Sequence, residues 1–168
     1  MTDIEYSYVK IVESIARFLD TRFPKTKVYT NPINQGAIIP CWCVVRMPDN
    51  TTKPQVNSRE IRGIGFELVY LRKLEDEKAF DYYDKALDIL ESDFRYLEYT
   101  DDAGNTSTIQ ILDRKHTINH TGLHYQFRLK VRVKEQKPTG SKFGKLRLEF
   151  TTRRKYEENC KCSQNKQR

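Results

Sequence analysis

The chain has 168 residues, of which 38% are hydrophobic and 32% are charged. This length and composition are typical of a single soluble domain that buries its own core. No apolar run approaches the roughly 20 residues of a membrane-spanning helix, and the opening residues MTDIEYSYVK lack the apolar stretch of a signal peptide. We therefore expect a protein that matures in the cytosol. Its net charge of +7 permits contact with nucleic acid or with acidic protein surfaces.

The first part of the chain predicts a helix followed by two strands. Residues 3–20 have the three- and four-residue apolar spacing of an amphipathic helix, which Pro24 prevents from continuing. Residues 27–30 (KVYT) are a short strand candidate. The β-branched and aromatic residues of 41–47 (CWCVVRM) favour a second strand. Residues 48–60 are polar, contain two prolines and lack periodicity, so we expect a loop there.

A third strand and a second helix are predicted next. In residues 61–73 apolar side chains occupy parts of both faces, which is typical of a central strand. Gly63 and Gly65 indicate a bulge or the close approach of another backbone. Residues 76–97 return to helical spacing, with Asp76 as the expected N-cap. The apolar stripe of this helix consists of Phe80, Tyr83, Leu87, Leu90, Phe94 and Leu97.

The strongest pattern is the strict alternation in residues 123–134, LHYQFRLKVRVK. Apolar residues take one face of the predicted strand, and polar, mostly basic residues take the other. Upstream, residues 107–113 (STIQILD) predict a strand, and residues 114–122 are either a strand or a loop. Downstream, residues 146–150 alternate again and predict an antiparallel partner for 123–134.

These elements together predict an α+β fold. We expect a single domain over residues 1–152, in which two helices pack on a mainly antiparallel or mixed β-sheet in the order α-β-β-β-α-β-β-β. Residues 153–168 lose all pattern, so we expect a basic, disordered tail.

The cysteines form two C-x-C pairs, Cys41/Cys43 and Cys160/Cys162. Four thiolates could bind zinc. However, a C-x-C pair on a strand is more often a pair of small buried hydrophobic residues, and the second pair lies in the expected tail. We therefore favour free cysteines over a zinc site.

Other candidate sites are equally weak. The histidines at 116, 120 and 124 are spaced by four, but the residues between them disfavour a helix, so we interpret them as surface histidines on a hairpin. The sequence contains no motif for nucleophilic catalysis. We expect no enzyme activity, no metal and no cofactor.

A row of cations, which we call the basic comb, lines the polar face of the strand 123–134: Arg128, Lys130, Arg132 and Lys134. Alternate residues of a strand are about 6.5–7 Å apart. The basic comb could therefore follow a phosphate backbone, face an acidic protein surface, or form the solvated side of an antiparallel sheet. Tyr125 and Phe127 lie on the opposite face, whereas sheets that bind nucleic acid expose aromatic residues to stack on bases.

The order of the elements and several short phrases form one further pattern: Val28-Tyr29, Gln35-Gly36, Pro40-Cys41 and Phe66-Glu67-Leu68. These phrases lie in the segments KVYTNPINQGAIIPCWCVV and RGIGFELVYLRK, and the helix that contains DYYDKALDIL follows. Over about residues 4–152 the chain resembles the tail terminator proteins of tailed phages, prophages and phage-tail-like particles of Gram-positive bacteria.

The resemblance implies a structural protein of the virion tail, assembled in the cytoplasm of the host bacterium. Such proteins form a six-fold ring that caps the tail tube, ends its polymerisation and provides the surface for joining the head. The implied partners are further copies of the chain, the tail tube protein and head–tail connector proteins, with genome DNA passing through the lumen without sequence-specific binding. The family pattern has no catalytic, cofactor or metal residues to transfer.

If the resemblance holds, two sets of residues are candidate contacts. The basic comb would meet the acidic face of the second helix on a neighbouring subunit, which carries Asp81, Asp84 and Asp88. The predicted loop 48–60 would contact the tube through Asn50, Lys53, Gln55 and Arg59.

Two alternatives remain open from the sequence. One is a small basic nucleic-acid-binding protein, whose affinity for duplex DNA would fall steeply with salt. The other is a different neck or tail-completion component, which would share the same surface chemistry.

Overall fold

The computed structural model describes residues 4–30, 37–56, 59–73 and 78–134. These residues form two helices and seven strands. The elements are α1 (Tyr8–Arg22), β1 (Lys27–Tyr29), β2 (Cys41–Arg46), β3 (Thr51–Gln55), β4 (Arg59–Leu71), α2 (Ala79–Asp93), β5 (Tyr96–Thr100), β6 (Thr106–Asn119) and β7 (Gly122–Lys134).

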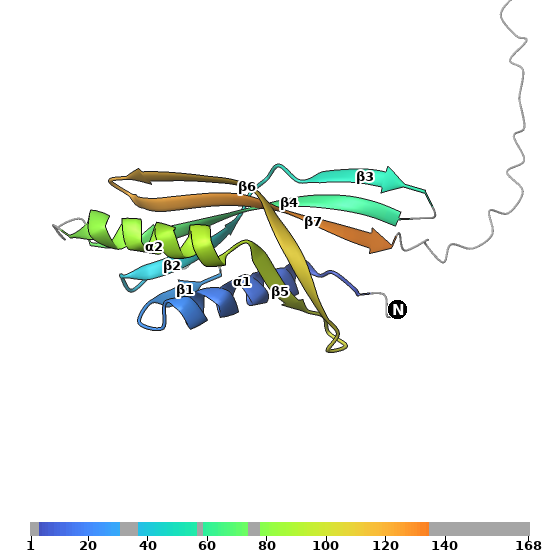
Figure 1. The fold of residues 1–168 in the computed structure, drawn as a ribbon, viewed down its shortest axis with the longest axis horizontal. Coiled ribbons are helices and arrows are strands. Elements are labelled where there is room, and N and C mark those ends of the chain that lie inside the picture. The colour runs from blue at the N-terminus through green and yellow to red at the C-terminus, as the bar shows by residue number, and fades with distance from the viewer. Residues whose placement is uncertain (1–3, 31–36, 57–58, 74–77, 135–168) are drawn as a thin grey trace, which may run out of the picture. The chain divides into compact units, whose positions relative to one another are not determined.

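The strands form one curled sheet in the order β1-β2-β4-β7-β6-β5, with β3 paired to β4 (Figure 1). Only β1 and β2 are parallel; the other pairs are antiparallel. At the centre, β4 and β7 are paired from Arg59 opposite Lys134 to Tyr70 opposite Leu123. This ladder pairs the predicted central strand with the strand that has the strictest apolar alternation.

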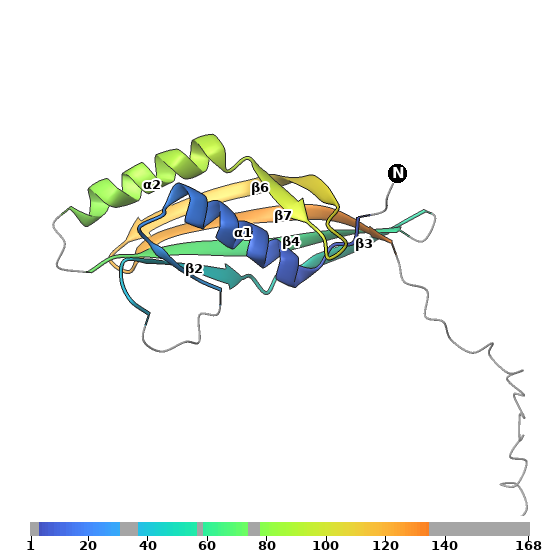
Figure 2. The same cartoon turned by 90° about the horizontal axis from the view of Figure 1, so that it is seen from below.

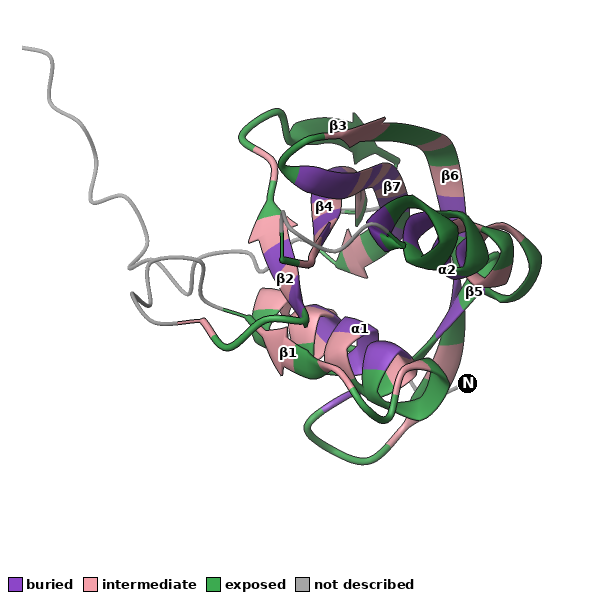
Figure 3. Cartoon of the chain, turned by 90° about the vertical axis from the view of Figure 1, so that its left-hand side faces the viewer, coloured by how far each residue is buried: buried purple, intermediate pink, exposed green. Residues whose placement is uncertain are grey.

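Both helices lie against the same, concave face of the sheet (Figures 2 and 3). The Phe94 ring, just after α2, joins the layers: it packs edge-on to Phe127 of β7, with ring centroids 5.0 Å apart, and lies 4.5 Å from Phe18 of α1. The helix residues buried against the sheet are Ile11, Ile15 and Leu19 of α1 and Tyr83, Ala86 and Leu90 of α2. The concave face is therefore the core, and the outer face of the sheet is left for other contacts.

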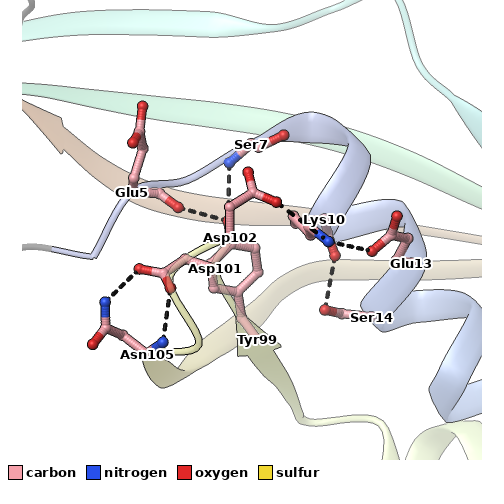
Figure 4. Close-up of polar contacts among 9 residues, drawn as sticks. All are labelled: Glu5, Ser7, Lys10, Glu13, Ser14, Tyr99, Asp101, Asp102 and Asn105. Atoms are coloured by element: carbon pink, nitrogen blue, oxygen red, sulfur yellow. Dashed lines mark hydrogen bonds and ion pairs between the residues drawn. The ribbon is translucent and has the colours of Figure 1, made fainter.

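The residues before α1 are held by a polar clasp to the hairpin between β5 and β6 (Figure 4). The buried Tyr99 hydroxyl donates to the Glu5 carbonyl (2.7 Å) and accepts from the Ser7 N–H (3.0 Å). Lys10 forms an ion pair with Asp102 at 3.3 Å. Burial raises the pKa of Tyr99, so its hydroxyl remains protonated and can donate.

The hairpin itself is shaped by Asp101, whose carboxylate accepts from the backbone N–H of Asn105 (2.7 Å) and from its side-chain amide (2.9 Å). Hydrogen bonds from Asn105 hold the pKa of Asp101 below its usual value. Gly104 has φ +84, a conformation that side chains disfavour. This turn places Tyr99 and Asp102 where the clasp needs them.

The predicted α+β class, with two helices on a mixed sheet, is confirmed, and the predicted elements up to residue 134 occur in the predicted order, with β3 and β5 in addition. The predicted start of the first helix is wrong, because residues 4–7 are not helical and Ser7, the N-cap of α1, has an extended backbone (φ −112°, ψ 140°). The second helix ends at Asp93, not at residue 97, because a two-residue alternation begins at Tyr96. In that alternation Leu97 and Tyr99 point into the core as part of β5.

The prediction of a loop at 48–60 is also wrong. Residues Thr51–Gln55 form β3, which pairs antiparallel with the first residues of β4. Pro54 fits there because β3 lies at the edge of the sheet, where proline is tolerated. The predicted strand 107–113 and the segment 114–122 form one strand, β6, with a bulge between Leu112 and Lys115. Asp76, the predicted strand 146–150, the domain boundary at 152 and the tail 153–168 lie outside the described residues.

We expect Tyr99→Phe to lower the free energy of unfolding by about 1–3 kcal/mol, because it leaves the Ser7 N–H and the Glu5 carbonyl without their partner. Urea denaturation followed by circular dichroism measures the change. Tyr96→Phe, on the same strand but 58% exposed, is the control and should change stability by less than about 0.5 kcal/mol. Equal effects of the two substitutions would show that the clasp does not hold the first helix.

Candidate functional site: a basic arm and an acidic helix

Three strand segments continue together where β6 leaves β7: Thr51–Gln55 of β3, residues 59–63 of β4 and residues 130–134 of β7. We call them the basic arm. Figure 1 shows the arm extending past the two helices. Above residue 129, β7 has no pairing with β6, which turns away to pair with β5. The arm is therefore built on the β4–β7 ladder alone, with β3 added at its side.

The register of the arm places its cations other than Arg62 on one face. Lys53 lies opposite Ile61, and Ile61 lies opposite Arg132. In the next row, Gln55 lies opposite Arg59, which lies opposite Lys134. The residues predicted for tube contact and the basic comb thus share the outer face of the sheet, except for Asn50, which precedes β3. The sequence alone could not show this shared face, because the face exists only if residues 51–55 form a strand.

The cations at the arm are exposed and have no ionic partner among the described residues: Lys53, Arg59, Lys130 and Arg132. Nearby acidic groups are already bound. Glu60 pairs with Arg62 at 3.1 Å, and Glu67 accepts from Gln126 (3.1 Å) and contacts His124 (3.1 Å). Like charges gathered on one face of a sheet are unfavourable without a partner. The arm therefore presents positive charge that this part of the chain does not neutralise.

Arg128 differs from the rest of the basic comb, because it is half-buried and ion-paired with Asp49. The chain between β2 and β3 reaches over the outer face here, and both predicted glycines allow it. A Cβ at Gly65 would lie 3.0 Å from Cβ of Met47, and one at Gly63 would lie 2.5 Å from Oγ1 of Thr51. The close approach at both glycines is by side-chain atoms, not by the backbone that was predicted. Asp49 was missed by sequence reasoning, because no local pattern links it to a residue in β7.

On α2, Asp81, Asp84 and Asp88 are exposed, while Tyr83 and Ala86 between them are buried. We call these three residues the acidic stripe. Their spacing puts them on one side of the helix, away from the sheet. The helix covers the concave face, whereas the cations of the arm lie on the outer face. One chain therefore does not bring its acidic stripe and its basic comb together.

Within the described residues, the remaining candidates do not come together as a site. Thr117 lies opposite His124, and His116 lies opposite Tyr125, so these two histidines point to opposite faces. Cys41 and Cys43 form no disulfide bond, and burial raises the pKa of Cys41 to about 11. The described residues contain no cluster of histidines, cysteines and carboxylates that could hold a metal ion. Cys160 and Cys162 lie outside them.

The sequence profile of the family described as phage tail terminator protein matches residues 10–141. The chain belongs to this family. The match covers every described element after the start of α1, including the basic arm and the acidic stripe. No match was found among curated proteins. Membership gives this terminator a structural role in completing the phage tail, contacts with other tail or head components, and a place in the virion tail. Neither helix in the described part of the chain is long and apolar enough to cross a membrane.

We expect replacement of Lys53, Arg59, Lys130 and Arg132 by glutamine to weaken non-specific binding to a polyanion. For duplex DNA, the slope of log affinity against log salt should fall by about 3–4, because each phosphate contact contributes roughly 0.9. Fluorescence anisotropy with labelled duplex DNA measures it. The control variant replaces four exposed cations elsewhere: Arg17, Lys25, Lys27 and Arg95. If the control variant lowers the slope equally, the cations of the arm do not bind DNA more strongly than other exposed cations of the chain.

Proposed function

We propose that this terminator closes into a ring, with six copies as the expected number, on the end of the tail tube. The ring stops the addition of tube subunits and offers its free side to the connector proteins of the head. The role is structural rather than catalytic. Family membership supports the tail-completion role, and the separation of the two charged surfaces is the observation that supports a ring.

A ring requires a head-to-tail contact between two different patches of each subunit. The outer face of the arm and the acidic stripe are such a pair: they carry opposite charges and lie on opposite sides of the sheet. An acidic stripe from the next subunit would give the arm's cations the partners that they lack. Opposite charges across an interface also guide association and suppress wrong pairings.

Because Lys53 and Arg59 share a face with the basic comb, we assign them to this subunit contact. Gln55 remains the proposed tube contact, because it lies at the tip of the arm next to Val56, which is 83% exposed. Asn50, before β3, stays a prediction for the tube. In the assembled tail, genome DNA would pass through the lumen of the ring without sequence-specific binding.

A nucleic-acid-binding function is the second candidate, because the unpaired cations of the arm also suit a phosphate backbone. Tail assembly separates the two. We expect tubes assembled without this protein to have uncontrolled lengths, and tubes assembled with it to stop at one length with a ring at one end, as seen by negative-stain electron microscopy. Tubes of uncontrolled length in both samples would refute the ring function.

For the subunit contact, we expect Lys130→Glu with Arg132→Glu to abolish rings. The arm would then be acidic and would repel the acidic stripe of the neighbouring subunit. Arg128 is left unchanged, because it forms an ion pair with Asp49 within the chain. Asp84→Lys with Asp88→Lys should also abolish rings. All four substitutions in one chain should restore them, because the charges are exchanged.

Native mass spectrometry and negative-stain imaging, with and without tail tubes, measure the rings. Rings of wild-type abundance in either double variant would place the contact elsewhere. A failure of the fourfold variant to recover, while both double variants lose their rings, would show that the two surfaces do not face each other.

A further inference from the structure

The last residues of β7 have a strand on one side only. β7 pairs with β4 along its whole length, but its pairing with β6 ends where Ile111 lies opposite Leu129. There the Ile111 N–H donates to the Arg95 carbonyl (3.0 Å), and the earlier residues of β6 pair with β5. No described strand pairs with residues 130–133 on the side away from β4. We call this segment the open edge.

The directions of the hydrogen bonds show which groups the open edge presents. In antiparallel pairs, residues that exchange hydrogen bonds alternate with residues that do not. Because the N–H of Ile111 points to Arg95, Ile111 and Leu129 form a pair without mutual hydrogen bonds. The next residue on β7, Lys130, therefore directs its N–H and C=O away from β4, and so does Arg132. These groups can receive a further strand.

The other edge of the arm is built differently. β3 carries Pro54, which has no N–H to donate and is typical of a sheet edge that is closed to further pairing. The open edge of β7 contains no proline and, in its register with β4, no bulge. The two sides of the arm are thus unequal, and only β7 offers a continuous template.

We propose that the open edge of β7 receives an extended segment of a partner protein in which acidic and apolar residues alternate. On the outer face, the segment would lie beside the exposed Lys130 and Arg132. On the concave face, Val131 is already buried (3% exposed), and the segment would lie beside the half-buried Val133. Neighbouring side chains on one face of a sheet contact each other, so the cations favour carboxylates and Val133 favours an apolar residue.

The same cations exclude other occupants. Lysine and arginine on a sheet edge repel basic strands and discourage pairing with copies of the same edge. An acidic segment is attracted by the same charges. Lys130 and Arg132 therefore both protect the open edge from unwanted pairing and select an acidic partner. The added segment lies in the plane of the sheet. Its carboxylates would share Lys130 and Arg132 with the proposed subunit contact, but its backbone hydrogen bonds use a different part of the arm, so the inference does not depend on the ring.

The test uses an acetylated and amidated hexapeptide of alternating glutamate and valine as the probe, with the isolated full-length protein. Arg132→Pro removes the edge N–H, but keeps the ladder to β4 because that N–H points away from β4. Arg132→Thr is the matched control, because it loses the same charge and keeps the N–H. Isothermal titration calorimetry gives the affinities, and urea denaturation shows that both variants fold.

We expect the wild-type chain to bind this peptide and not its lysine–valine counterpart. Arg132→Pro should bind about tenfold more weakly than Arg132→Thr, since it loses a backbone hydrogen bond and disturbs its neighbours. Equal affinities of these two variants, or no binding by the wild-type chain, would overturn the proposal. If Arg132→Pro does not fold, the pair Lys130→Pro and Lys130→Thr replaces it.

Hydrogen exchange provides a readout without substitutions. In the free protein the amides of Lys130 and Arg132 should exchange quickly, while the amide of Val131, which faces β4, exchanges slowly. Addition of the glutamate–valine peptide should slow exchange at Lys130 and Arg132. Unchanged exchange at both residues with the peptide bound would place the peptide elsewhere and refute strand addition.

Discussion

The antiparallel ladder between β4 and β7 is the contact on which the rest of the structure depends. It holds Phe66 opposite Phe127 and Leu68 opposite Tyr125 on the concave face, where all four are buried. The same register places the alternating residues, such as Glu67 and Gln126, on the outer face. A slip of one residue would move each of them to the opposite face. Core and charged surface are therefore set by one register.

The arm arises because β7 continues beyond the end of its pairing with β6. The bulge in β6 and the turn of its first half towards β5 leave the end of β7 supported by β4, which in turn carries β3. The helices fill the concave face below the longer part of the ladder, and Phe94 joins both of them to β7. The positively charged segment is thus rigidly attached to the core, yet stands outside the part that the helices cover.

The sequence predicted what regular patterns determine. The alternation of 123–134 gave the correct strand and its two faces, and helical spacing gave both helices. The sequence prediction failed where pairing between strands determines the structure. Residues 51–55 have no apolar alternation, and they form a strand because they pair with the edge of β4. For the same reason, the sequence did not show that the basic comb and the residues predicted for tube contact share one surface. It also did not show that Asp49, in the connection between β2 and β3, pairs with Arg128.

The distribution of charge along the outer face separates structural from functional cations. On the outer face of β7, the polar side chains up to Arg128 have partners: His124 and Gln126 meet Glu67, and Arg128 meets Asp49. Beyond it, Lys130 and Arg132 have none within the described residues. On β7, Arg128 is ion-paired while Lys130 and Arg132 on the projecting arm have no ionic partner among the described residues, which favours contact over stability there. For a tail terminator, this arrangement leaves favourable electrostatic energy to be gained when the arm contacts other tail or head components.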